Sequence, residues 1–320
     1  GTPLLMNALF IKPSSLGDIV HGLQLAESLK REIDDLKISW VSREMFAPLV
    51  ESCRTVEEVF IFNRKGGLRD FIRLLGDVRK REFEWVIDLQ GLFRSGLICF
   101  FSRGENKAGR ADAREGAKFF YPKMPPLPET GKGSHALEIL LQFRKLFDLP
   151  PELSGAIQFN SDLPEAVKDK LLSNHSATKL LLFPESRRAE KEWPYFEELS
   201  SRLLKTRKDI QIIWAASEAI KVDLPFPGGQ FVNLSGETSI ESLPALIESA
   251  DIVLSNDSGP MHLAAALNKP TLGLFGPTSP NRFGPWGQLD RVLTAQDGDL
   301  RNLTIRKVQE QTEYEIDKNI

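Results

Sequence analysis

The feature that most constrains the fold is an alternation of short apolar runs with amphipathic segments, which occurs twice along the chain. Runs such as Ala8–Lys12 have the length of buried strands, whereas Asp18–Arg31 carries apolar residues at helical spacing. This alternation predicts βαβ units around a parallel sheet. The expected strands are 8–12, 38–42, 56–62, 85–88, 179–183, 210–215, 230–234, 251–255 and 271–275. The expected helices are 18–31, 44–53, 68–81, 93–101, 134–147, 194–205, 240–249 and 260–268.

A proline-rich stretch divides the two alternating regions. Residues 149–164 have weak periodicity, and 104–133, rich in Gly, Pro and charge, is expected to be a loop. A chain of 320 residues fits two domains at about 150 residues each. We therefore expect domains at 1–150 and 179–320, a linker at 151–178, and two doubly wound α/β sheets facing a cleft. Ligands of such sheets bind at the carboxyl ends of the strands.

The charge is unevenly distributed. The chain has a formal net charge of −3, yet residues 60–123 hold 14 basic and 8 acidic residues. Such a stretch suits an acidic partner, such as phosphate-bearing lipid or sugar, or nucleic acid; alternatively it is a solvated face. A nucleic-acid partner is disfavoured, because the whole chain is negative and contains no recognised nucleic-acid module.

Several common chemistries leave no signature in this sequence. Neither first strand is followed by G-x-G-x-x-G, and no P-loop or G-x-S-x-G motif is present. The histidines at 21, 135, 175 and 262 lack metal-ligand spacing, so no metal site is expected. Cys53 and Cys99 lie in apolar surroundings and are expected to be buried, inert thiols. No apolar run reaches the roughly 18 residues of a membrane span, and Met6 is the expected natural start.

Three junctions between a strand and a helix remain as candidate sites. Asp18 follows Gly17 at the start of a helix, so it is either an N-terminal capping carboxylate or a general base. Residues 255–266 pass from a strand into a helix whose first N–H groups suit a phosphate, with a capped helix start as the alternative. The long loop 183–194 carries cations suited to a diphosphate, or is a solvated charged loop.

Four ordered motifs carry a family resemblance. They are Ser14-Ser-Leu-Gly-Asp-Ile-Val-His21, Asp88-Leu-Gln-Gly-Leu-Phe-Arg-Ser95, Lys191-Glu-Trp-Pro194, and Asn256-Asp-Ser-Gly-Pro-Met-His262 followed by Phe275-Gly-Pro-Thr-Ser-Pro280. The chain resembles the ADP-heptose:lipopolysaccharide heptosyltransferases from about residue 7 to 310. It is more similar to the type that adds the first heptose to the Kdo region of lipid A.

The resemblance implies a GT-B fold, with two Rossmann-like domains, and inverting transfer with no metal or other cofactor. Asp18 falls on the family's base, and Glu218 lies nearest to its ribose-binding acid. Its donor-binding positions correspond to Ser186, Lys191, Asp257, Ser258, Gly259 and His262. Its acceptor-binding basic positions correspond to Arg64, Arg94 and Arg114.

The implied partners are ADP-heptose, Kdo-lipid A and an anionic membrane surface, with the protein cytoplasmic and peripheral at the inner face of the bacterial inner membrane. Two other hypotheses remain open. One is the same fold with another acceptor, such as the second core heptose position or a protein hydroxyl. The other is a non-catalytic protein that binds sugar nucleotides.

Overall fold

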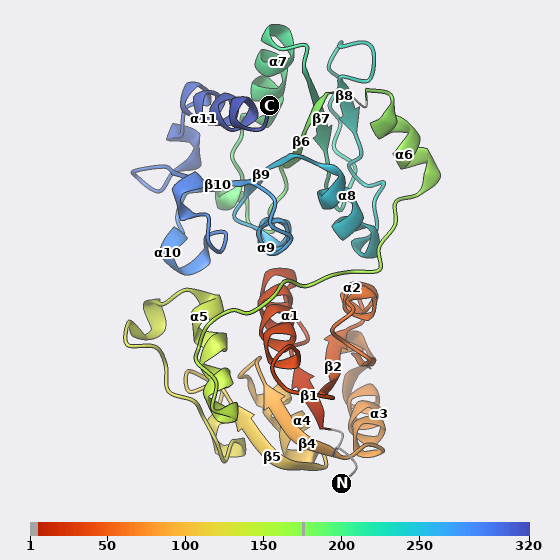
Figure 1. Ribbon diagram of the computed structural model, residues 1–320, viewed down its shortest axis with the longest axis vertical. Coiled ribbons are helices and arrows are strands. Elements are labelled where there is room, and N and C mark those ends of the chain that lie inside the picture. The colour runs from red at the N-terminus through yellow and green to blue at the C-terminus, as the bar shows by residue number, and fades with distance from the viewer. Residues whose placement is uncertain (1–5, 175–176) are drawn as a thin grey trace. The chain divides into compact units, whose positions relative to one another are not determined.

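The protein forms two compact units, residues 1–160 and 161–320. The structure is a computed structural model that describes residues 6–174 and 177–320 (Figure 1). Residues 1–5, ahead of the expected start at Met6, and His175 lie outside the described residues. Each unit is an α/β sheet with parallel strands only, as the alternation predicted.

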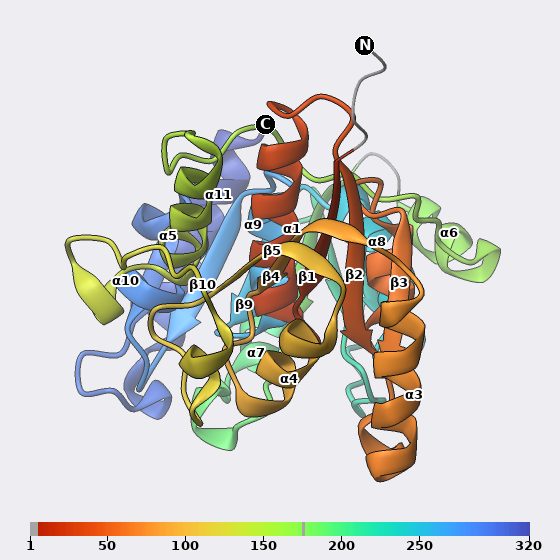
Figure 2. The same cartoon turned by 90° about the horizontal axis from the view of Figure 1, so that it is seen from below.

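The first unit contains a five-stranded parallel sheet in the order β3-β2-β1-β4-β5. Its strands are β1 (Asn7–Ile11), β2 (Lys37–Arg43), β3 (Glu58–Phe62), β4 (Phe83–Asp88) and β5 (Gly104–Gly109). Its helices are α1 (Leu16–Lys30), α2 (Ala47–Ser52), α3 (Gly67–Arg79), α4 (Phe93–Phe101) and α5 (Ala136–Leu141). Short 3₁₀ turns are η1 (Arg64–Gly66), η2 (Ala117–Phe120), η3 (Gly131–Gly133) and η4 (Gln142–Phe147). Helix α1 packs beside α5, and α3 beside α4 (Figure 2).

The second unit contains a six-stranded parallel sheet in the order β11-β10-β9-β6-β7-β8. Its strands are β6 (Thr178–Phe183), β7 (Ile210–Trp214), β8 (Phe231–Asn233), β9 (Ile252–Asn256), β10 (Thr271–Phe275) and β11 (Val292–Thr294). Its helices are α6 (Glu165–Leu172), α7 (Phe196–Thr206), α8 (Leu243–Ser249), α9 (Gly259–Ala266), α10 (Pro280–Phe283) and α11 (Ile305–Lys318). Its 3₁₀ turns are η5 (Ala189–Lys191), η6 (Ile240–Ser242), η7 (Leu289–Arg291) and η8 (Leu300–Asn302).

Burial explains why the central strands are continuous apolar runs. Residues 9–11 of β1 and 180–182 of β6 are fully buried, because helices cover both faces of a doubly wound sheet. Both thiols are buried as expected, and burial raises the pKa of each. In each unit the strand order reverses beside its first strand, which places a switch point between β1 and β4 and another between β6 and β9.

The sequence reading was wrong at several elements. Residues 104–133 are not all loop, since Gly104–Gly109 forms β5 at the edge of the sheet. The sequence Gly-Glu-Asn-Lys-Ala-Gly has no apolar alternation, and only pairing with β4 makes it a strand. The segment expected as a linker contains α6, and the predicted single helix at 134–147 is α5 followed by η4. Beyond residue 275, α10, β11 and α11 were not predicted.

Candidate functional site

Asp18 lies in the first turn of α1, which follows β1 at the switch point of the first unit. The helix begins at Leu16, and Ser15 is its N-cap. The carboxylate accepts a 3.5 Å hydrogen bond from the Ser15 backbone N–H at Oδ2, and the residue is exposed. Asp18 is thereby the N3 residue of a capping box with Ser15, although its own hydrogen bond is long and therefore weak. An exposed carboxylate at this position can be reached by a substrate hydroxyl.

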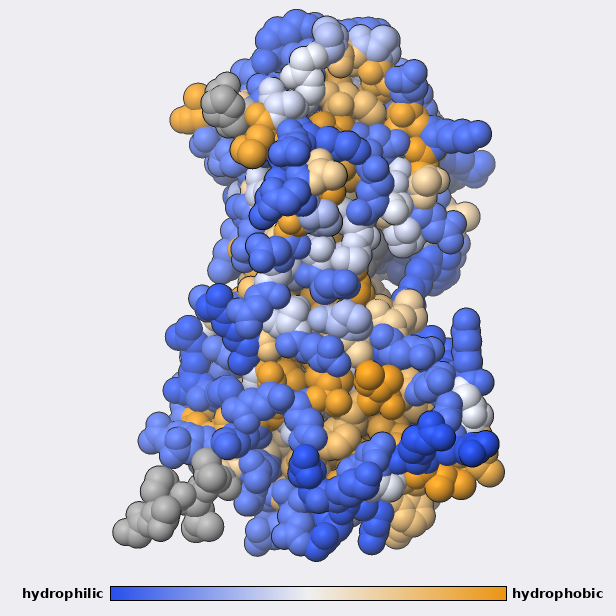
Figure 3. All heavy atoms as spheres, turned by 90° about the vertical axis from the view of Figure 1, so that its right-hand side faces the viewer, coloured by the Kyte–Doolittle hydropathy of each residue, from blue (hydrophilic) through white to orange (hydrophobic). Residues whose placement is uncertain are grey.

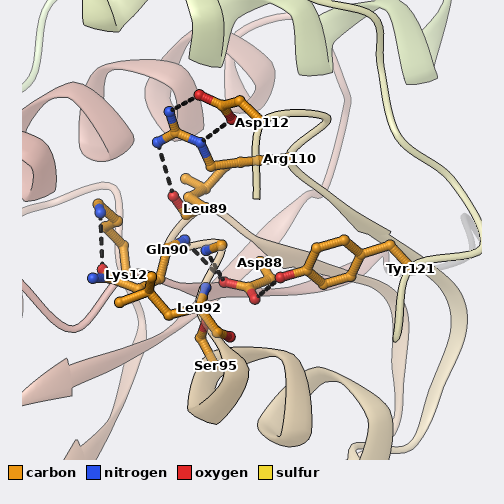
Figure 4. Close-up of polar contacts among 10 residues, drawn as sticks. Lys12, Asp88, Leu89, Gln90, Leu92, Ser95, Arg110, Asp112 and Tyr121 are labelled. Atoms are coloured by element: carbon orange, nitrogen blue, oxygen red, sulfur yellow. Dashed lines mark hydrogen bonds and ion pairs between the residues drawn. The ribbon is translucent and has the colours of Figure 1, made fainter. Parts of the chain in front are cut away.

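Lys12 is a site residue that the sequence reading missed. It ends the apolar run of β1, is only 4% exposed, and donates from Nζ to Gln90 Oε1 at 2.8 Å (Figure 4). Burial lowers the pKa of Lys12, and the nearby Asp18 carboxylate partly offsets this effect. Lys12 is thus a buried amine at the switch point that interacts electrostatically with the exposed Asp18 carboxylate. The signal in the sequence is a lysine that directly follows four apolar strand residues.

The Asp88-Leu-Gln-Gly motif builds the turn that holds Gln90 against Lys12. Asp88 is fully buried at the end of β4, and its Oδ1 accepts from the backbone N–H groups of Gln90 at 2.9 Å and Gly91 at 3.3 Å. The Tyr121 hydroxyl donates to Asp88 Oδ2 (Figure 4). Gly91 has a φ of +70°, which an L side chain rarely adopts. The Asp88 carboxylate is therefore a structural group that shapes this turn.

The buried Asp88 carboxyl should affect how stability depends on pH. Burial raises the pKa of Asp88 above the ordinary value of 3.8. The contribution of an acid with a raised folded-state pKa to the stability of the fold is fully present at pH values below its pKa in the unfolded chain. This contribution is lost as the pH rises through the pKa that the acid has in the folded protein. Asp88→Asn keeps the acceptor for Gln90 and Gly91 but cannot ionise. We expect the free energy of unfolding of Asp88→Asn to rise relative to that of the parent protein as the pH increases above 3.8. The rise should be at most about 1.4 kcal/mol per pH unit.

Chemical denaturation of both proteins across a pH series measures this difference. Asp77→Asn, on α3, is the matched control, because the Asp77 side chain is 46% exposed. A stability difference for Asp88→Asn that stays constant with pH would contradict the assignment.

The three arginines expected to hold an acceptor all follow strands of the first sheet, and all are exposed. Arg64 begins η1 after β3, Arg94 lies in the first turn of α4, and Arg114 follows β5. None forms an ion pair with a carboxylate of the described residues. The Arg114 backbone N–H donates to Gly91 O at 2.8 Å, which ties its loop to the Asp88 turn. Parallel strands place their carboxyl ends at one edge, so these three arginines lie at the same edge of the sheet as the switch point.

Arg110 is a further cation that the sequence reading missed. It forms a two-bond pair with Asp112 at 2.8 and 2.9 Å, and its Nη1 donates to Leu89 O at 3.3 Å (Figure 4). The loop after β5 is thereby fixed against the Asp88 turn.

The second unit brings together two predicted residues at its own switch point. Lys191, in η5 after β6, pairs with Asp257, which follows β9, at 3.1 Å between Nζ and Oδ2. Thr278, after β10, donates to the same Oδ2 at 2.6 Å. The Lys191 side chain is 20% exposed and the Asp257 side chain 8%. A carboxylate thus holds the lysine in place, and part of its surface stays open to an anion.

Helix α9 starts beside this ion pair. Ser258 is its N-cap and Gly259 its first residue, one position before the predicted start at Pro260. Pro260 is tolerated because the first helical N–H groups have no partner within the helix. These N–H groups and the helix dipole favour an anion next to Lys191. His262 is 9% exposed, within the first turn of the same helix.

Asn256 fixes the loop that carries Lys191, a role the sequence reading missed. It is fully buried at the end of β9, accepts from Trp193 N at 3.0 Å and donates to Pro184 O at 2.8 Å. Ser186 donates its backbone N–H to Glu192 Oε1 at 3.1 Å, within the same loop. This loop is therefore held at both ends against the β9 terminus, while residues 187–190 between those ends are exposed.

Glu218, the acidic residue predicted to bind the ribose, is held by fewer contacts than Lys191 and Asp257 are. Glu218 is exposed in the loop after β7, and none of the contacts described here joins it to Lys191 or Asp257. Glu185 instead holds that loop, because it accepts from the backbone N–H of Ser217 at 2.6 Å. Among residues 6–174 and 177–320, no group of three or more His, Cys, Asp or Glu side chains is arranged to hold a metal ion. In the same ranges no helix is long and apolar enough to cross a membrane.

Comparison with known proteins shows which family the chain resembles as a whole. The model of the family described as "Glycosyltransferase family 9 (heptosyltransferase)" matches residues 71–312. The chain is 28% identical to lipopolysaccharide heptosyltransferase 1 of Escherichia coli O18:K1:H7, over 98% of this chain and 99% of that one. It is 29% identical to lipopolysaccharide heptosyltransferase 1 of Pseudomonas aeruginosa, over 88% and 82% of the two chains.

Solved structures share the fold. The E. coli heptosyltransferase WaaC with ADP superposes with a TM-score of 0.78 at 24% identity, over 97% of this chain and 100% of that one. A glycosyl transferase family 9 protein from Veillonella parvula DSM 2008 gives a TM-score of 0.80 at 18% identity, over 98% and 97%. The expected GT-B type of α/β fold is thereby confirmed.

Proposed function

The chain belongs to glycosyltransferase family 9, the heptosyltransferases. We propose that it transfers heptose from ADP-heptose to the Kdo region of lipid A, a step of lipopolysaccharide inner-core synthesis. The curated relatives named as lipopolysaccharide heptosyltransferase 1 support this choice of reaction. The observation that carries the proposal is the Lys191–Asp257 pair beside the start of α9, which forms an anion site at the second unit's switch point.

In this proposal the second unit binds the donor. Lys191 and the N–H groups at Gly259 contact the diphosphate, while Asp257, itself bonded by Thr278, holds the lysine. As the sugar–phosphate bond breaks, negative charge grows on the departing ADP, and fixed donors stabilise that charge without reorganising. Ser186, Ser258 and His262 complete the contacts to phosphate and heptose, and Glu218 contacts the ribose.

The first unit binds the acceptor and supplies the base. An acceptor hydroxyl attacks the anomeric carbon, Asp18 takes the hydroxyl proton, and ADP leaves from the opposite face with inversion. The exposure of Asp18 suits it to reach a substrate hydroxyl. Arg64, Arg94 and Arg114 hold the carboxylates and phosphates of the acceptor, since each guanidinium is exposed and outside any ion pair among the described side chains.

The proposed place of action follows from the acceptor. Kdo-lipid A is anchored in a membrane and carries anionic groups, so we place the protein in the cytoplasm, peripheral to the inner face of the inner membrane. Basic groups near such a surface contribute about 1 kcal/mol each to attraction.

The direct test measures ADP release from ADP-heptose with Kdo-lipid A and with a heptose-bearing core acceptor. We expect turnover with Kdo-lipid A and much slower turnover with the other acceptor. A thermal-shift series with ADP-heptose, UDP-sugars and GDP-sugars tests the donor, because a ligand raises the melting temperature of the fold it binds. Faster turnover on the heptose-bearing core would assign the second core position, and donor binding without turnover would indicate a non-catalytic binding protein.

A further inference from the structure

Helices α3 and α4 and the turn η2 carry an unusual share of the exposed apolar surface. Of the 13 large apolar side chains exposed among the described residues, six lie on these three elements. Phe119 is 95% exposed and Leu68 is 73% exposed. The six residues of this α3–α4 face are Leu68, Ile72, Phe93, Phe100, Phe101 and Phe119.

Ring contacts and a backbone bond join these elements into one surface. The partly buried Phe120 lies 5.7 Å from both the Phe93 and Phe100 rings, and Phe100 lies 5.1 Å from Phe101, measured between ring centroids. Arg79, at the end of α3, donates to Phe101 O at 2.6 Å. The rings of Phe93, Phe100 and Phe101 are therefore linked into one cluster that includes Phe120. Exposed apolar patches on such a fixed surface usually mark a binding surface.

Basic side chains lie on the same elements as the apolar ones, and one of them, Arg73, pairs with Asp70 of α3 at 3.4 Å. Arg69 and Arg73 lie on α3, and Lys118 lies on η2 next to Phe119. Lys107 Nζ lies 5.9 Å from the centre of the Phe100 ring and donates to Phe100 O at 2.7 Å. Figure 3, which faces the side where α3 lies in Figure 1, shows apolar side chains interspersed with charged ones on this unit.

This combination favours a lipid bilayer over a protein partner. Exposed aromatic and aliphatic groups among Lys and Arg are typical of surfaces that lie in a membrane interface, and an excess of basic over acidic residues suits anionic lipid. Residues 60–123, which contain the whole face, hold 14 basic and 8 acidic residues. Phe93 is the first residue of α4 and follows the Asp88 turn, so the face adjoins the part of the first unit that is proposed to bind the acceptor.

We propose that the α3–α4 face docks on an anionic lipid bilayer, with Leu68, Ile72 and Phe119 entering the headgroup region and the surrounding Arg and Lys contacting lipid phosphates. This docking rests on the proposed function in one respect, namely that the acceptor is a lipid anchored in the same bilayer. Docking there presents the arginines at the carboxyl edge of the first sheet to an acceptor held in the membrane.

Vesicle flotation of the full-length protein tests the proposal. The vesicles are phosphatidylcholine with or without phosphatidylglycerol, at low and high salt. We expect binding only with phosphatidylglycerol, weakened by salt, and lowered about tenfold or more in L68S/I72S/F119S. The matched control is L172S/Y314S in the second unit, because Leu172 is 62% and Tyr314 57% exposed. This control should bind as the parent does.

Two further measurements separate the possible failures. Turnover of ADP-heptose with a water-soluble, deacylated Kdo acceptor should be unchanged in L68S/I72S/F119S, which shows that the variant is folded and active. Unchanged vesicle binding by that variant would overturn the docking face while leaving heptose transfer intact. Loss of a parent dimer in the variant, seen by analytical ultracentrifugation, would reassign the face to self-association and overturn the proposal. Face-dependent vesicle binding without turnover on any acceptor would support the face and refute the proposed function.

Discussion

Asp18→Ala is expected to lower kcat by about 10²–10⁴, the usual contribution of a general base. Binding of ADP-heptose should change little, because Lys191, Asp257 and α9 belong to the other unit. The fold should lose less than about 1 kcal/mol, since the carboxylate is exposed and has one long hydrogen bond, to Ser15 N. Steady-state kinetics with saturating acceptor, together with isothermal titration of ADP, measure both quantities.

The control for this prediction is Glu165→Ala. Glu165 is an exposed acid in the first turn of α6, so its removal reproduces the loss of a helix N-terminal carboxylate without touching the proposed site. Near-normal turnover by folded Asp18→Ala would leave Asp18 as a helix-stabilising residue only.

Lys191→Ala should produce the second large effect, a loss of about 10²–10³ in kcat/KM for ADP-heptose. The variant removes the cation that faces the diphosphate, and it also leaves the Asp257 carboxylate, 8% exposed, without its cationic partner. Negative charge left at the site then repels the donor, so the affinity for ADP should fall as well. Lys191→Arg should restore part of the activity, because it keeps the charge but changes the geometry.

Lys205→Ala on α7 is the matched control for Lys191→Ala, since Lys205 is an exposed lysine near the same unit's core. Titration of ADP and kinetics at varied donor concentration distinguish binding from chemistry. An unchanged Kd for ADP in Lys191→Ala would contradict the assignment of Lys191 to the diphosphate.

The candidate site was predictable where one short segment contains its chemistry. The start of α9 at Ser258 and Gly259 could be found because a strand, a small-residue turn and a helix are consecutive in the chain. The partner of Lys191 could not be assigned from residue patterns alone, since Asp257 lies 66 positions away and meets it only when β6 and β9 pair. The Asp88 motif was recognised, but burial and the Tyr121 contact decide that its carboxylate shapes a turn.

The sequence by itself determined the α/β class and the repeated parallel sheet, because strands buried on both faces must be apolar along their whole length. Tertiary structure alone decided that the polar segment Gly104–Gly109 becomes an edge strand and that Lys12 is buried against Gln90. It also decided that six large apolar side chains of α3, α4 and η2 remain uncovered while others on the same elements are buried. Helical periodicity specifies which residues share a face, whereas only packing of distant segments determines whether that face is covered.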